Sequence, residues 1–259
     1  MEKKKIVEIK NISMTYHTLD GETKAIKDIN LNINKGEIVS LVGPSGCGKS
    51  TLLSIIAGLI EPTKGEILIK EKKIKGPNKE VGYMFQRDHL FEWRTIIENV
   101  LIGLEIQGRV NEKQYKNAEN LLDIYGLSEF KESFPRQLSG GMRQRVALIR
   151  TLIVEPDLLL LDEPFSALDY QTRLAIADEI GIILKKEGKT ALMVTHDISE
   201  AISVSDRVVV LSKRPATIKD IIPINLTCPG GVRTPMKCRE APEFRYYFNQ
   251  IWKELDIHV

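Results

Sequence analysis

A glycine-rich loop between an apolar run and a helical run constrains the fold of this 259-residue chain more than any other feature. The loop follows the apolar residues 38–42 and precedes the helical run from Leu52 to Gly58. A strand, such a loop and a helix form the unit in which backbone N–H groups surround phosphate groups. The bare pattern arises by chance in on the order of one chain in a hundred of this length. We therefore expect a phosphate-binding loop made of Gly43, Pro44, Ser45, Gly46, Cys47, Gly48, Lys49, Ser50 and Thr51.

Three side chains of this loop have an expected chemistry. Lys49 is placed to reach the β- and γ-phosphates as a point charge, and the Ser50 hydroxyl is placed to ligate Mg²⁺. Cys47 lies near a helix N-terminus, a position that lowers the pKa of a thiol and favours its oxidation. The other cysteines, Cys228 and Cys238, show no metal-ligand spacing, so neither a disulfide framework nor a zinc site is favoured.

The five residues from Leu138 to Met142 predict a second anion site. Ser139 is placed to cap a helix beside Gly140 and Gly141, so that unpaired N–H groups and the positive end of the helix dipole face an anion. A chain with one phosphate loop has no obvious need of another. We infer that this site serves a nucleotide bound by a different copy of the protein.

Two carboxylates follow the apolar run Leu158 to Leu161. Such a run predicts a buried strand, and ligands of open α/β sheets bind at the carboxyl ends of strands. Asp162 suits Mg²⁺, and Glu163 is placed to polarise a water molecule for attack on a γ-phosphate. Alone the pattern is weak, because buried strands often end in acids, but downstream of a phosphate loop it becomes strong.

Gln86 and His196 each end a predicted strand, over 81–85 and 191–195. A single Gln or His is usually structural, but both end strands of the nucleotide sheet, which favours γ-phosphate sensing. Tyr16 precedes the loop, where stacking on adenine and simple packing near the first strands are about equally expected. The expected Mg²⁺ ligands are Ser50, Gln86 and Asp162.

Charge and hydropathy exclude two classes of protein. The chain has 37 basic and 35 acidic residues, a net charge of +2, which is no electrostatic footprint for nucleic acid. No apolar run approaches the roughly 18 residues of a membrane-spanning helix. The lysines after Met1 precede an alternating pattern instead of the apolar core of a secretory signal, so we expect a cytoplasmic protein.

Hydrophobic periodicity divides the chain into a β-rich part, a helical part and a part in which strands and helices alternate. The period is two over 6–42, 65–74 and 81–86, and lies between three and four over about 95–153. The alternating part implies a parallel sheet, followed by a loop over 223–242 and a last helix. Its expected elements are the strands 158–161, 191–195 and 208–211 and a helix over about 171–186.

Together these motifs resemble the ATP-binding cassette (ABC) ATPases of membrane transporters, over nearly the whole chain. The loop at 43–51 matches Walker A, Gln86 the Q-loop, 138–142 the signature, 158–163 Walker B, 166–169 the D-loop and His196 the switch histidine. Tyr16 falls where the family has its adenine-stacking aromatic residue. The resemblance implies an α/β P-loop NTPase fold, an ABC cassette with a mixed central sheet, an antiparallel β-subdomain and an inserted α-helical subdomain. It implies an ABC ATPase domain at 1–235, with the helical subdomain at about 95–153, and a C-terminal helical extension at 236–259.

Several segments are similar to the nitrate, sulfonate and taurine importer branch, features that subunits for thiamine-precursor uptake share. The signature ends in Met142 where the family usually has Gln, but its Ser and both Gly residues are intact. The other segments of this similarity are Trp93-Arg94, Arg143 to Leu148, Thr195 to Ile198, Glu200-Ala201 and Leu211 to Pro215.

The resemblance implies a homodimer that holds two ATP molecules with Mg²⁺ and drives two transmembrane permease subunits, served indirectly by an extracellular or periplasmic substrate-binding protein. No nucleic acid partner is expected, and the protein would lie on the inner face of the cell membrane. The loop from Gln86 to Arg94, with Phe91 and Trp93, would receive a helix of the permease, or its aromatic residues simply pack together. The alternative is a cytosolic ABC ATPase without a transport role. A GTPase-like switch is excluded because Asn78-Lys79 lacks the Asp that would complete a guanine-reading motif.

Overall fold

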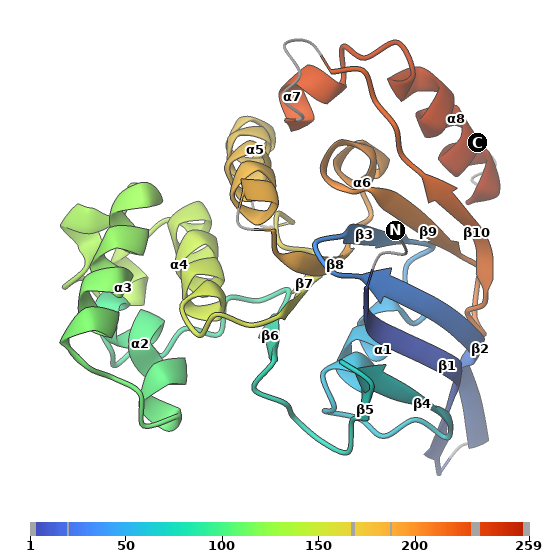
Figure 1. The fold of residues 1–259 in the computed structure, drawn as a ribbon, viewed down its shortest axis with the longest axis horizontal. Helices are drawn as coiled ribbons and strands as arrows, with labels where there is room; N and C mark the ends of the chain where they lie inside the picture. Colours follow the sequence, from blue (N-terminus) through green and yellow to red (C-terminus); the bar gives the residue numbers. More distant parts are fainter. Residues whose placement is uncertain (1–3, 20, 167–168, 187, 229–233, 256–259) are drawn as a thin grey trace.

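The computed structural model describes residues 4–19, 21–166, 169–186, 188–228 and 234–255. The structure has two sheets, with one helix between them and other helices on the outer face of the second sheet (Figure 1). A separate group of helices lies to one side. The strand order is β2-β1-β4-β5 in the first sheet and β10-β9-β3-β8-β7-β6 in the second.

The first sheet is antiparallel and built on two long strands. These are β1 (Lys5–Thr18) and β2 (Gly21–Asn34), followed by β4 (Lys64–Ile69) and β5 (Lys72–Lys73). Alternate side chains of β2 are buried in its second half, as the period of two predicts. The predicted strand pair between Gly65 and Ile74 is confirmed, with its turn at Lys70 and Glu71, both at positive φ.

The second sheet is mixed. Its parallel strands are β3 (Ile38–Val42), β6 (Val81–Met84), β7 (Leu158–Asp162), β8 (Thr190–Val194) and β9 (Arg207–Leu211). The edge strand β10 (Ile218–Pro223) runs antiparallel to β9 and was not predicted from the sequence. Its burial pattern is weak, because an edge strand beside a loop buries only part of one face.

The apolar strands are buried on both faces, and alternate residues contact different helices. Leu158 and Leu160 of β7 pack in the same cluster as α1 (Lys49–Ile56), together with residues of the first sheet. Leu159 and Leu161 pack in the cluster of α5 (Tyr170–Lys186). Helices therefore cover both faces of this sheet, and α1 lies between the two sheets.

The helical group contains α2 (Ile96–Ile106), α3 (Glu112–Ile124) and α4 (Gly140–Leu152), with two 3₁₀ turns at Ser128–Phe130 and Pro135–Gln137. Thr95 begins α2 with a capping box to Glu98. The helical period predicted over about 95–153 is seen in α3, where Ala118, Leu122 and the C-cap residue Tyr125 are buried. This group forms the green part of Figure 1, beside β6 and β7.

The C-terminal part contains α6 (Ile198–Val204), α7 (Pro235–Cys238) and α8 (Phe244–Glu254). The prediction of a loop over 223–242 was wrong for α7, which Thr234 caps and Pro235 begins. The last helix packs its apolar stripe on α6, with Ile251 fully buried. The Sγ atoms of Cys228 and Cys238 lie 2.9 Å apart, a proximity that their spacing did not predict. In the described part of the chain, no helix has the length and apolar character needed to cross a membrane.

Candidate nucleotide-binding site

The glycine-rich loop connects the carboxyl end of β3 to the start of α1. Gly46 and Gly48 adopt positive φ values of 68° and 125°. At Gly48 a Cβ would lie 3.1 Å from the carbonyl oxygen of Ala25, so the loop approaches the first sheet too closely for a larger residue. The buried Lys49 ammonium donates to the carbonyl oxygens of Gly43 and Pro44, at 2.8 and 3.0 Å. The loop is therefore held in shape by its own lysine.

A cavity of about 640 Å³ opens in front of this loop. It brings together most of the predicted site residues from separate segments. Its lining residues are Tyr16, Ala25, Ser45, Gly46, Gly48, Lys49, Ser50, Thr51, Gln86, Glu163, His196 and Arg214. The volume lies in the usual range for small-molecule and cofactor sites.

Tyr16 forms one wall of the cavity, near the end of β1. Its hydroxyl lies 3.2 Å from the Oγ1 atom of Thr51, the last residue of the loop. The side chain is 36% exposed, so it is not fully packed into the core. A ring that is fixed at its hydroxyl end and open to a cavity can stack on a planar group.

Asp162 ends β7 and reaches the loop from the opposite side. Its Oδ1 atom accepts from the Ser50 hydroxyl at 3.2 Å, and its Oδ2 atom accepts from the Tyr83 hydroxyl at 3.4 Å. Burial raises the pKa of Asp162, and the hydrogen bond from Ser50 opposes that rise. Burial also raises the pKa of Tyr83 to about 12, so this phenol remains a proton donor. Tyr83 was missed from the sequence, because nothing in an apolar strand marks one tyrosine as a carboxylate partner.

The pair of Ser50 and Asp162 fits a magnesium ion. Hydroxyl and carboxylate oxygens are the hard donors that Mg²⁺ prefers, with substrate phosphates completing its shell. Among the described residues no cluster of three or more His, Cys, Asp or Glu side chains could hold a metal by itself. A magnesium ion at this place would therefore depend on the phosphate groups of a bound substrate.

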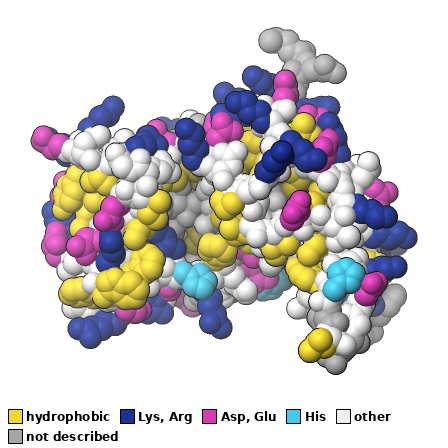
Figure 2. Space-filling model, turned by 90° about the horizontal axis from the view of Figure 1, so that it is seen from below, with side chains coloured by type: hydrophobic (Ala, Val, Ile, Leu, Met, Phe, Trp, Pro, Cys, Tyr) yellow, Lys and Arg dark blue, Asp and Glu magenta, His cyan; other side chains and the backbone are white. Residues whose placement is uncertain are grey.

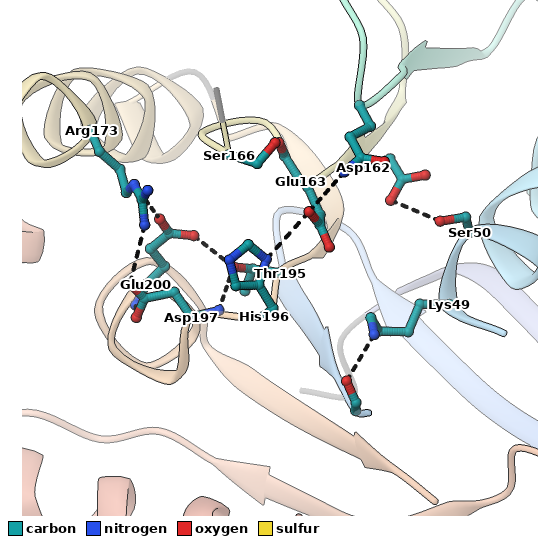
Figure 3. A network of polar contacts seen from close by, with 12 residues as sticks. Lys49, Ser50, Asp162, Glu163, Ser166, Arg173, Thr195, His196, Asp197 and Glu200 are labelled. Atoms are coloured by element: carbon teal, nitrogen blue, oxygen red, sulfur yellow. Dashed lines mark hydrogen bonds and ion pairs between the residues drawn. The ribbon is translucent and has the colours of Figure 1, made fainter. Parts of the chain in front are cut away.

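Glu163 lies where the ends of β6, β7 and β8 meet (Figure 3). Its Oε2 atom accepts from Nε2 of Gln86 at 3.1 Å and lies 3.3 Å from Nδ1 of His196. Its backbone N–H donates to Val194 of β8 at 2.9 Å, and its φ is 48°. A positive φ is uncommon outside glycine and is found at functional sites that the surrounding structure holds in place. Three residues predicted from separate motifs thus converge on one point.

A network of hydrogen bonds and ion pairs lies beside His196 and includes its neighbours Thr195 and Asp197 (Figure 3). The buried Glu200 carboxylate accepts from the Thr195 hydroxyl at 2.6 Å and pairs with Arg173 of α5 at 3.7 Å. Asp197 caps α6 through the N–H groups of Ser199 and Glu200. Burial raises the pKa of Glu200. From the sequence, Glu200 had only a place in the resemblance and Arg173 had no predicted role, because their contact joins residues far apart in the chain.

The signature lies at the start of α4. Ser139 is the N-cap, and its Oγ atom accepts from the Met142 N–H at 3.3 Å, which confirms the predicted cap. Gly140 and Gly141 form the first turn of the helix. Of the described residues, those that line the cavity do not include Ser139, Gly140 or Gly141. The two predicted anion sites of this chain are therefore separate.

The expected low pKa of Cys47 was wrong. The thiol is only 1% exposed, and burial raises its pKa by more than Lys49, the backbone N–H groups and Arg214 lower it. Burial outweighs the helix terminus because a thiolate loses its water there. Cys47 is therefore a packed residue of the loop, and its neutral thiol is favoured.

The D-loop motif is described only at its two ends. The Ser166 hydroxyl donates to the carbonyl oxygen of Glu163 at 3.0 Å, so the motif begins in contact with the end of β7. The Asp169 carboxylate accepts from the Thr172 N–H at 3.0 Å, and these hydrogen bonds lower its pKa. Ala167 and Leu168 lie outside the described residues.

Comparison with known proteins identifies the family. The family model described as ABC transporter matches residues 26–166 of this chain. The chain belongs to the ABC transporter ATP-binding proteins. It is thus an ATP-binding subunit whose hydrolysis of ATP powers transport.

Relatives are similar over nearly their whole length. An uncharacterized ABC transporter ATP-binding protein of Bacillus subtilis, YtlC, is 46% identical over 96% of this chain and 95% of its own. The nitrate import ATP-binding protein NrtD of Synechocystis is 43% identical over 95% and 93%. The taurine import ATP-binding protein TauB of Roseobacter denitrificans is 39% identical over 94% and 93%. These importer-type relatives match the predicted branch.

Solved structures show the same fold. The ATP-binding cassette MJ0796, in a dimeric post-hydrolysis state bound to ADP and Pi, is 35% identical. It superposes with a TM-score of 0.73 over 83% of this chain and 99% of its own. The predicted fold class, an ABC cassette with a mixed sheet and an antiparallel sheet, is therefore confirmed.

Proposed function

We propose that this chain is the ATPase subunit of an importer for a small nutrient of the nitrate, sulfonate, taurine or vitamin-precursor kind. The observation that carries the proposal is the convergence of Glu163, Gln86 and His196 on a cavity whose floor is the phosphate loop. The importer assignment rests on the relatives named for nitrate and taurine import.

In the proposed reaction, the γ-phosphate of ATP is attacked by a water molecule that the Glu163 carboxylate polarises. Gln86 and His196 both contact that carboxylate, and they would orient the water and the γ-phosphate around it. Phosphoryl transfer depends mainly on such positioning and on charge stabilisation. Lys49 would leave the loop carbonyls for the β- and γ-phosphates, and Tyr16 would stack on adenine.

The Mg²⁺ site is also part of the proposal. Ser50, Asp162 and Gln86 would hold the ion with the substrate phosphates. When bound, Mg²⁺ neutralises charge on the β- and γ-phosphate oxygens. Since Ser50 and Asp162 already contact each other, these two donors need little rearrangement.

A head-to-tail homodimer completes the proposed site. Ser139, Gly140 and Gly141 are not among the described residues that line the cavity, and their N–H groups would bind the γ-phosphate held by the partner subunit. The dimeric state of the related cassette supports this arrangement. ATP would then close the dimer, and hydrolysis would reopen it.

The contact with the transmembrane subunits is proposed for the segment from Gln86 to Arg94. Asn99 holds this segment, because its side chain bonds to the backbone of Phe91 and Arg94. Phe91 and Trp93 lie 5.0 Å apart by ring centroid, and Trp93 is 73% exposed. Hydrophobic side chains also gather at the end of the molecule that carries the helical group (Figure 2). Such a surface suits a permease helix, at the inner face of the membrane.

The decisive experiment uses Glu163→Gln, which keeps the shape of the side chain and removes its charge. ATP turnover should fall by about 10²- to 10⁴-fold while ATP binding remains, because a positioned base contributes that much. Gel filtration with ATP should then show a stable dimer, whereas the wild type shows a transient one. A variant that stays monomeric with saturating ATP at micromolar concentration would refute the dimer mechanism.

A further inference from the structure

The cavity contains a second cation that no proposed step uses. Arg214 lies in the turn between β9 and β10. In the sequence, Arg214 belongs to the segment Leu211 to Pro215 of the importer resemblance and has no predicted role of its own. Its guanidinium lines the cavity together with Gly46 and Lys49.

Arg214 grips the tip of the phosphate loop. Its Nε and Nη2 atoms both donate to the carbonyl oxygen of Gly46, at 3.1 and 2.6 Å. The next N–H along the chain, that of Cys47, donates to Pro44 at 3.2 Å. The peptide between Gly46 and Cys47 is therefore held at its carbonyl and at its N–H. This fixes the orientation of the left-handed turn at Gly46.

The turn that carries Arg214 is itself braced. Ser212 and Thr217 close it through the bond from Ser212 N–H to the Thr217 carbonyl and the bond from Thr217 N–H to the Ser212 hydroxyl, both 2.9 Å. Ala216 joins β2, because its N–H donates to the carbonyl of Ala25 and its carbonyl accepts from Lys27 N–H, also at 2.9 Å. Ala25 lines the cavity too. Arg214 thus extends from a fixed backbone between two walls of the site.

The guanidinium has donors to spare. It carries five N–H groups in a planar fork, and the bonds to Gly46 use two of its nitrogens. Within the described residues, the hydrogen bonds of the Arg214 guanidinium go to the Gly46 carbonyl, and the residue is exposed. Its charge reaches the loop, because Arg214 and Lys49 both act to lower the pKa of Cys47 against the larger effect of burial. A charged fork that is anchored at one edge and open at the other suits a phosphate group.

We propose that Arg214 is a further nucleotide-binding residue, which holds the Gly46 carbonyl with one edge of its guanidinium and donates the other edge to a phosphate of the bound nucleotide. This inference rests on the nucleotide occupying the cavity as proposed above. Arg214 adds a second, permanently charged contact to that of the Lys49 ammonium. Through its turn, Arg214 also connects the phosphate contact to β9, β10 and, by the bonds of Ala216, to β2 of the first sheet.

The test compares three variants by equilibrium binding of ATP, ADP and AMP. Arg214→Gln should weaken ATP binding by about 10-fold or more, the usual effect of losing a charge-assisted hydrogen bond. Arg214→Lys should lose less, because it keeps the charge but not the fork. Lys213→Gln removes the same charge from the neighbouring exposed residue, and its ATP affinity should stay within about 2-fold of wild type.

Two further measurements separate a loss of nucleotide contact from a loss of loop structure. The nucleotide-free Arg214→Gln protein should unfold at nearly the wild-type temperature, and its loss of affinity should be larger for ATP than for AMP. The inference is overturned if Arg214→Gln matches Lys213→Gln, or if ATP and AMP lose affinity equally. Failure of the wild-type protein to bind ATP would instead overturn the proposed site itself.

Discussion

The phosphate loop and the signature are both built to face an anion, but the structure completes only one of them. Around the loop, residues of β1 and β2 and of the segments after β6, β7, β8 and β9 meet in one cavity. At the signature, one serine caps one helix, and Ser139 is exposed. In the proposed function the cavity therefore binds the nucleotide within one chain, whereas the signature binds a ligand held by the partner subunit. This difference is the physical reason to expect a dimer.

The sharpest way to break this comparison is to mix two inactive variants. Lys49→Ala damages the loop and Ser139→Arg blocks the signature, so each homodimer should lose about 10²- to 10³-fold of its ATPase rate, the cost of losing one anion-stabilising group. A mixed dimer regains one intact site only if the signature serves the partner's nucleotide. Recovery of ATPase activity on mixing is the measurement. No recovery in mixtures that form dimers would place the signature on its own chain's nucleotide.

Tyr16→Ala sharpens the comparison from the side of the cavity. Loss of the aromatic platform should weaken ATP binding by about 1–3 kcal/mol, because that is the usual contribution of stacking on an aromatic side chain. Tyr16→Phe is the matched control, since it keeps the ring and removes only the hydroxyl bond to Thr51. Titration calorimetry of the monomer measures both. Equal losses in the two variants would assign the effect to the hydroxyl and refute the stacking role.

Asp162→Asn tests whether the buried carboxylate beside Ser50 costs the folded protein stability. The pKa of Asp162 is raised in the folded protein by burial, so the folded state disfavours the carboxylate relative to the unfolded state. Removing this charge should raise the unfolding temperature of the nucleotide-free protein by a few degrees at neutral pH. The gain should shrink as the pH falls through the raised pKa, since the wild-type carboxyl becomes neutral there.

Calorimetry at pH 7 and at pH 4.5 provides this measurement. Asn keeps an acceptor oxygen for one of the Ser50 and Tyr83 hydroxyls, and its amide N–H group can donate to the other, so the variant removes the charge and reverses one hydrogen bond. A wild type that is more stable than Asp162→Asn at pH 7 would contradict the assigned cost.

Ser139→Ala, at the signature, removes only the helix cap. It should lower the free energy of unfolding by about 1 kcal/mol, with no such pH dependence.

Features that depend on neighbouring residues were predicted from the sequence, and features that depend on distant residues were not. The phosphate loop, the cap at Ser139 and the helical period of α3 are of the first kind. The expected pKa of Cys47 failed, because burial comes from packing that the local pattern does not contain. The edge strand β10 and the short helix α7 were missed, since both are stabilised by what they pack against.

The candidate site divides in the same way. Sequence order and spacing predicted Gln86, Glu163 and His196, and the family comparisons match the fold they belong to. Only the folded sheet, which brings distant strands together, shows how these residues contact one another. It places nitrogen atoms of Gln86 and His196 within 3.3 Å of the Glu163 carboxylate. It also shows the hydrogen bond from Tyr83 to Asp162, the ion pair of Arg173 with Glu200 and the hydrogen bonds of Arg214 to Gly46.

The sequence by itself determined the kind of protein, because the phosphate loop, the signature and the acidic strand end are local patterns whose chemistry is readable from residue types. Only the tertiary structure decided which side chains share the cavity and that the signature lies outside it. The physical reason is that strand ends far apart in the chain become neighbours through the order β9-β3-β8-β7-β6, which hydrogen bonding and burial on both faces establish together.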